Sequence, residues 1–158
     1  MTRCKAMGNN RGFTLIELMV TIAVLAIVTV MAIPTFDKVV LAQNFNKSTQ
    51  DLVVQLNNAR SKAVLERRSV EVKLNSLSTD TVNPDTVTTL NWGPTGYAIL
   101  KSGSPTTITF LLSGGVKDYD ANIKNKPFVI CNKNGGNKAK SIDISLMGTV
   151  QITEGTTC

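Results

Sequence analysis

The strongest constraint on this chain is an apolar segment that runs from Phe13 to Ile33 with one ionisable side chain, Glu17. An α-helix rises about 1.5 Å per residue, so a segment of this length matches a bilayer hydrocarbon layer about 30 Å thick. A secretory signal would end in a cleavage site behind small residues, and no such exit follows this apolar run. We therefore expect residues 13–34 to form a retained transmembrane helix.

The flanks of this helix predict its orientation. Before it, Arg3, Lys5 and Arg11 are the only charged residues. Because positive flanks stay in the cytoplasm, the N-terminus is expected inside and the remaining chain outside. At the other end, Pro34 cannot donate a helical hydrogen bond and should kink the helix near the outer membrane boundary.

The position of Glu17 distinguishes this segment from an ordinary membrane helix. A carboxylate inside a membrane helix costs about 2.5 to 3.5 kcal/mol on insertion scales, so it usually has a partner or a function. The alternative is a side chain that simply reaches the headgroups from the helix end. The block RGFTLIE at residues 11–17, between a basic leader and an apolar helix, resembles the class III signal of type IV pilins and type II secretion pseudopilins.

This resemblance implies a processing site and an assembly site. A prepilin peptidase would remove the leader peptide, residues 1–12, by cutting between Gly12 and Phe13, and would methylate the new Phe13 amine. Glu17 would attract the N-terminal amine of a neighbouring subunit, because opposite charges attract strongly in a low dielectric. The implied partners are other minor and major pilin subunits, joined through the N-terminal helix, together with the prepilin peptidase, the inner-membrane assembly platform and membrane lipid.

The exported part has a modest charge and the size of one small domain. Loss of the leader with its three cations lowers the formal net charge from +6 to +3, which is weak evidence for a nucleic-acid partner. Residues 35–158 are expected to form a single periplasmic domain that includes the amphipathic second half of the helix.

The second half of the chain predicts a helix followed by strands. No Gly or Pro interrupts residues 35–67, and apolar residues recur there at helical spacing. That face contains Phe45, Leu52, Leu56, Ala59 and Ala63. Strict alternation of apolar and charged residues over residues 70–74 then indicates a strand with one face exposed to solvent. Further strand candidates are residues 86–90, 97–100, 108–112, 128–132, 141–146 and 149–153. We therefore predict an α+β fold, with the long helix packed on an antiparallel sheet.

Four segments narrow the resemblance. The runs LNNARSKAV at 56–64, VEV at 70–72, WGPTGY at 92–97 and ITF at 108–110 are similar to the GspH/FimT group, which includes GspH-type pseudopilins and the FimT and FimU minor pilins. Within that group, some FimT-type proteins are thought to bind DNA through a basic C-terminal stretch. This chain has no arginines from Gly148 onward, which favours a FimU-like protein.

Two cysteines remain after the leader is removed, Cys131 and Cys158. An even number of cysteines in an oxidising compartment predicts a disulfide. In the chain-entropy model such a bridge would stabilise the domain by roughly 3 to 4 kcal/mol. Two unrelated thiols are the alternative.

The chain lacks the residues that usually carry catalysis. It has no histidine, which removes the commonest general base and the commonest metal ligand. The segment Asp118-Tyr119-Asp120 has too few ligands for a calcium loop, and Asn134-Gly135-Gly136-Asn137 indicates a hairpin turn rather than a phosphate-binding loop. We expect no catalytic residue, no cofactor and no metal, so the protein is not predicted to be an enzyme.

Five lysines lie between residues 124 and 140. Three of them, Lys133, Lys138 and Lys140, are the candidate contacts to DNA phosphates. Solvated loop lysines are the preferred interpretation.

The sequence therefore predicts a non-catalytic minor pilin that primes, or is incorporated at the tip of, a type IV pilus, with roles in pilus biogenesis, twitching, adhesion or DNA uptake. It would cross the inner membrane once, with the globular domain in the periplasm, and then enter the pilus fibre at the cell surface. The alternatives are a GspH-type pseudopilin of a type II secretion system and a FimT-type DNA-binding minor pilin for natural transformation.

Overall fold

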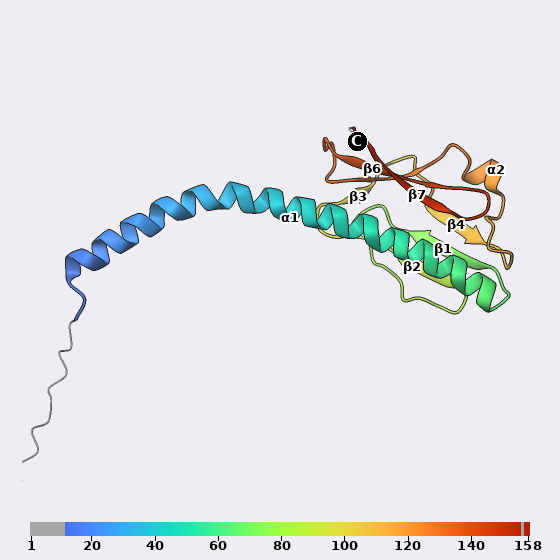
Figure 1. Ribbon diagram of the computed structural model, residues 1–158, viewed down its shortest axis with the longest axis horizontal. Helices are drawn as coiled ribbons and strands as arrows, with labels where there is room; N and C mark the ends of the chain where they lie inside the picture. The colour runs from blue at the N-terminus through green and yellow to red at the C-terminus, as the bar shows by residue number, and fades with distance from the viewer. Residues whose placement is uncertain (1–11, 156) are drawn as a thin grey trace, which may run out of the picture. The chain divides into compact units, whose positions relative to one another are not determined.

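The computed structural model describes residues 12–155 and 157–158, without the side chains of residues 31–35. The chain divides into two units at the boundary between Lys38 and Val39, inside the first helix. The elements, in chain order, are α1 (Leu15–Leu65), β1 (Val70–Leu74), β2 (Thr89–Trp92), β3 (Ile99–Leu100), β4 (Thr107–Phe110), α2 (Tyr119–Asn122), β5 (Phe128–Cys131), β6 (Ala139–Ile144) and β7 (Val150–Gly155) (Figure 1).

The predicted long helix is confirmed, and both of its ends have local causes. At the start, the Glu17 amide donates a hydrogen bond of 3.2 Å to the Thr14 hydroxyl, which satisfies an amide that has no helical partner. At the end, Arg67 takes a left-handed conformation with φ of 49°. The Arg68 amide then donates to the Ala63 carbonyl at 3.2 Å, so the last turn closes in a Schellman-type arrangement.

Pro34 lies within the helical range of α1. Its side chain is outside those that the structure describes. The kink predicted at this position stays a prediction.

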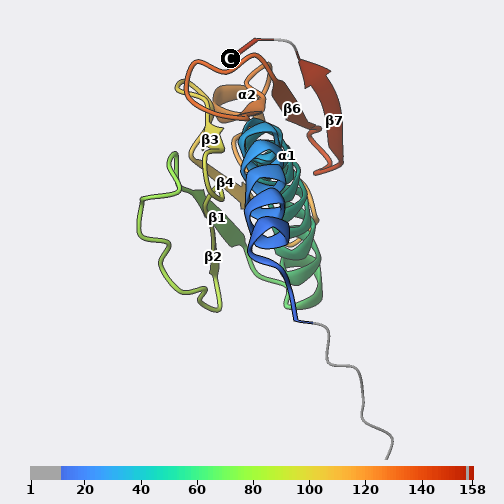
Figure 2. The ribbon, with the colours of Figure 1, turned by 90° about the vertical axis from the view of Figure 1, so that its left-hand side faces the viewer.

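The strands form two sheets, whereas the sequence predicted one antiparallel sheet. The first has the order β2-β1-β4 and the second β3-β5-β6-β7. All neighbours pair antiparallel except β1 and β2, which pair in parallel with Val72 opposite Leu90. A parallel neighbour needs a long return connection, and residues 75–88 provide it. Strand β2 and strand β7 lie at opposite margins of the unit (Figures 1 and 2).

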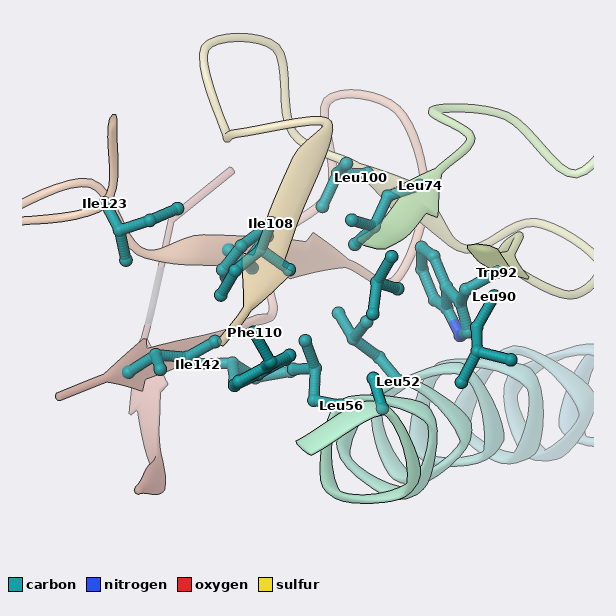
Figure 3. Close-up of a cluster of buried hydrophobic side chains, with 14 of the residues drawn as sticks. Leu52, Leu56, Leu74, Leu90, Trp92, Leu100, Ile108, Phe110, Ile123 and Ile142 are labelled. Carbon is teal, nitrogen blue, oxygen red and sulfur yellow. The ribbon is translucent and has the colours of Figure 1, made fainter. Parts of the chain in front are cut away.

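The core lies between α1 and the two sheets. All five residues of the predicted apolar helix face are buried, and Leu52, Leu56, Ala59 and Ala63 are fully enclosed. Leu52 and Leu56 point from α1 toward the strands, where Phe110 of β4 and Ile142 of β6 lie (Figure 3). Small residues at positions 59 and 63 let the strands approach the helix backbone closely.

The C-terminal strand depends little on this core. Most side chains of β7 are exposed, although all six of its residues pair with β6. Beyond β7, Cys158 forms a disulfide with Cys131 of β5, with 5.8 Å between the two Cα atoms. The bridge therefore ties the end of the chain to a buried strand.

Candidate assembly site on the N-terminal helix

The predicted cleavage site lies just ahead of α1. Gly12 and Phe13 precede the first helical residue and are exposed, with 82% of Phe13 accessible to solvent. The backbone at this position is therefore not protected by helical hydrogen bonds. Residues 1–11 of the predicted leader lie outside the described residues.

Glu17 stands in the first turn of α1, where the helix dipole favours a negative charge. Thr14 and Glu17 have the T-x-x-E spacing of a capping box, which is a sequence signal for the start of a helix. The structure shows one half of that box, the bond from the Glu17 amide to the Thr14 hydroxyl. Within the described part of the chain, the Glu17 carboxylate has neither a hydrogen-bond nor an ion-pair partner.

Apart from Glu17, this part of the helix is mainly apolar, and its hydroxyl groups bond to the backbone of the helix itself. The hydroxyls of Thr21 and Thr29 each donate at 2.8 Å to a carbonyl of their own helix, Leu18 and Leu25 respectively. The large apolar side chains of this segment are all exposed: Phe13, Leu15, Ile16, Leu18, Met19, Val20, Ile22, Val24, Leu25, Ile27, Val28 and Val30. A helix that is apolar all round is stable only where another apolar surface covers it.

Among the residues described, no helix has the length and hydropathy of a membrane span.

The five lysines between residues 124 and 140 do not form one free basic surface. Lys124 Nζ donates to Asp120 Oδ1 at 2.8 Å, and this hydrogen bond raises the pKa of Lys124 above its ordinary value. Lys126 Nζ donates to the Ala121 carbonyl at 2.9 Å. These two lysines are therefore committed to their own loop.

Lys140, one of the three candidate DNA contacts, is held by α1. Its Nζ donates to Asn46 Oδ1 at 2.9 Å and lies 5.3 Å from the centroid of the Phe45 ring. Lys133 and Lys138 are exposed and have no ion pair within the described residues. The structure thus separates Lys140, which joins a strand to the helix, from the two lysines of the β5–β6 turn.

The segment WGPTG at residues 92–96 has a packing role. Trp92 is buried in the core. Next to it, the Thr95 amide donates to the Ser48 hydroxyl of α1 at 2.8 Å. Gly96 lies against the side chain of Asn44, also on α1. These contacts dock the loop before β3 onto the helix.

The run LNNARSKAV has a similar role at the other end of the unit. Arg60 Nε donates to the Gly114 carbonyl at 3.2 Å, which fastens the turn after β4 to α1. The two residues are 54 positions apart, so no local sequence pattern indicates this contact.

No metal centre appears in the part of the chain that the structure describes, since no three His, Cys, Asp or Glu residues there are grouped to hold an ion.

Comparisons with known proteins agree with these features. Residues 7–33 match the sequence model of the prokaryotic N-terminal methylation motif. A comparison with curated protein sequences gives no match. Among solved structures, the chain is similar to the type IV minor pilin FimU of Pseudomonas aeruginosa strain PAO1, with 17% sequence identity and a TM-score of 0.50. The likeness covers 74% of this chain and 96% of that chain, and at this identity it shows the fold. The chain thus carries the prokaryotic N-terminal methylation motif on an α+β fold that is similar to the fold of a type IV minor pilin.

Proposed function

We propose that this protein is a non-catalytic minor pilin. It is cut after Gly12, methylated at Phe13 and inserted at or near the tip of a type IV pilus, where it primes assembly. The observation that carries this proposal is the carboxylate of Glu17, which has no partner among the described residues and lies on an exposed and otherwise apolar helix inside the methylation motif.

The apolar surface of the helix suits two environments that the subunit would occupy in turn. Before assembly, the subunit is stored in the inner membrane and lipid covers the apolar surface of residues 13–34. Helices of other subunits replace the lipid when the filament grows. Both environments are apolar, so transfer between them costs little for the leucine, isoleucine and valine side chains.

The carboxylate of Glu17 is less stable in lipid than in the filament. In lipid its carboxylate has no counter-charge and is costly to bury. In the filament the methylated amine of a neighbouring Phe13 lies at the start of a helix and carries one positive charge. Their pairing in a low dielectric relieves the cost for both groups and favours the assembled state.

Processing is the first test of this proposal. Intact-mass analysis of the protein extracted from membranes should show loss of residues 1–12 and one added methyl group on Phe13. The same mass should appear in sheared filaments. A protein that keeps Met1, or that is cut elsewhere, would contradict the pilin role.

A deletion strain separates the pilus from the type II secretion machine. We expect loss or shortening of pili and loss of twitching, with secretion of exoproteins unchanged. Complementation with the full chain should restore both properties. Loss of secretion with normal pili would assign the protein to the secretion pseudopilins instead.

A further inference from the structure

An exposed apolar surface lies at the C-terminal end of α1. It comprises Val64, Leu65, Leu112, Leu146 and Met147, whose exposed fractions range from 46% to 82%. We call it the α1-end surface. Its residues come from three segments: the last turn of α1, the turn after β4 and the turn between β6 and β7 (Figure 1).

Specific contacts hold these three segments together. Arg60 Nε donates to the Gly114 carbonyl, and a methyl group at position 114 would lie 3.2 Å from Val64 Cγ2, so the turn after β4 rests on α1. The Val116 amide donates to the Leu146 carbonyl at 3.0 Å, so the β6–β7 turn rests on the turn after β4. The α1-end surface is therefore built on hydrogen-bonded turns rather than on loose loops.

The apolar residues of this surface lie outside the buried core of the unit. Exposed apolar residues are common singly, but a group of large ones on adjoining segments is typical of a contact with another molecule. Turns are usually polar, so the exposed leucine and methionine side chains on these turns point to such a contact.

The charged residues that neighbour these segments in the chain are mainly positive. Arg67 and Lys117 are exposed and have no ion pair within the described residues. Arg60 donates Nε to a backbone carbonyl rather than to a carboxylate. Of the nearby acids, Glu66 is paired with Arg68 at 2.9 Å. Asp118 directly follows Lys117 in the chain.

This charge pattern selects the chemistry of a partner. A complementary surface needs apolar side chains at its centre and carboxylates at its rim. A second copy of the chain would bring the same positive end and the same net positive charge, +3 once residues 1–12 with their three cations are removed, so long-range repulsion disfavours it.

We propose that the α1-end surface binds a different pilin-like subunit through an apolar segment flanked by Asp or Glu. The proposal rests on the assembly role proposed above. It adds a contact of the globular unit, with Arg67 and Lys117 facing the partner's carboxylates, to the contact that the N-terminal helix makes.

Photo-crosslinking of the full chain in its native cells tests this contact. A benzophenone side chain replaces Leu112 or Met147, and Tyr97 serves as a control because it is 67% exposed and lies beside the Asn44 end of the unit. Positions 112 and 147 should give a covalent adduct with another protein, and position 97 should not. The crosslinked peptide, identified by mass spectrometry, should contain apolar residues and more than one carboxylate.

Charge variants make the test independent of the partner's name. Arg67→Asn removes one charge and suits the left-handed backbone at that position. Combined with Lys117→Glu, it should lower the adduct yield by about fivefold or more. Lys101→Glu, at an exposed position outside the α1-end surface, should leave the yield unchanged. Equal amounts of each variant in the membrane would show that folding is intact.

Several results would overturn the proposal. These are an adduct only with a second copy or with lipid, a crosslinked peptide without carboxylates, no adduct at all, or an adduct yield that the charge variants do not change. The failure of the assembly role is recognised separately, because the wild-type protein would then be absent from sheared pili. If the protein is present in pili and gives no adduct, the assembly role stands and the α1-end surface is not a contact.

Discussion

The backbone of Gly96 lies directly against the side-chain amide of Asn44, so any side chain at position 96 would have to displace Asn44. Gly96 also has a φ of +62°. A methyl group there would meet the Asn44 nitrogen and lie 3.2 Å from its oxygen. Together with the bond from Thr95 to Ser48, this contact seats the loop on the helix.

Gly96→Ala should therefore lower the free energy of unfolding by about 1 to 3 kcal/mol, because it adds a left-handed alanine and forces the Asn44 side chain to move. Gly103→Ala is the matched control, since its φ is +89° but nothing lies near the added methyl. It should cost only about 1 to 2 kcal/mol. Urea unfolding of residues 39–158, which hold the buried core, measures both values. Equal losses would mean that the Asn44 contact adds nothing.

Glu17 can be tested for charge separately from capping. Glu17→Gln keeps a polar side chain that suits the T-x-x-E capping pattern, whereas Glu17→Leu makes insertion easier by a few kcal/mol, about the cost of a buried charge. Both variants should reach the membrane and be cut after Gly12. Both should then be missing from sheared pili, because neither can pair with an amine. Wild-type incorporation of the Gln variant would show that the charge is not required.

The disulfide should protect the C-terminal strand. Thiol labelling of the denatured, unreduced exported unit should find no free thiol at Cys131 or Cys158. Replacing both with serine should lower the free energy of unfolding by about 3 to 4 kcal/mol. Amide exchange should rise first in β7, whose side chains are mostly exposed. Full labelling of the unreduced protein would rule out the bridge.

Lys140 should act as a structural residue. Lys140→Ala removes the hydrogen bond to Asn46 and the contact with Phe45, so it should lower the free energy of unfolding by about 1 to 2 kcal/mol. Lys133→Ala, in the exposed turn, should leave stability within about 0.5 kcal/mol of wild type. A DNA mobility shift over a salt series should show no difference between these variants. If Lys140→Ala leaves stability unchanged but weakens DNA binding, Lys140 is a phosphate contact instead.

The sequence alone predicted the features that depend on local pattern. The absence of Gly and Pro over residues 35–67 predicted a continuous helix, and the 3.6-residue spacing of Phe45, Leu52 and Leu56 identified its buried face. Strict alternation located β1 at residues 70–74. The glycines at 135 and 136 indicated the turn between β5 and β6. The four-residue helix α2 was missed, because so short a segment shows no periodicity.

Local sequence pattern was enough to predict the helix, its apolar face, the methylation signal and the candidate Glu17, since each follows from neighbouring residues. Tertiary structure alone decided that the strands form two sheets and that β2 runs parallel to β1. It also brought Lys140 to Asn46 across 94 positions of sequence. Such pairings depend on how the whole core closes around α1, because strand partners are chosen by long-range packing that the local alternation of residues does not specify.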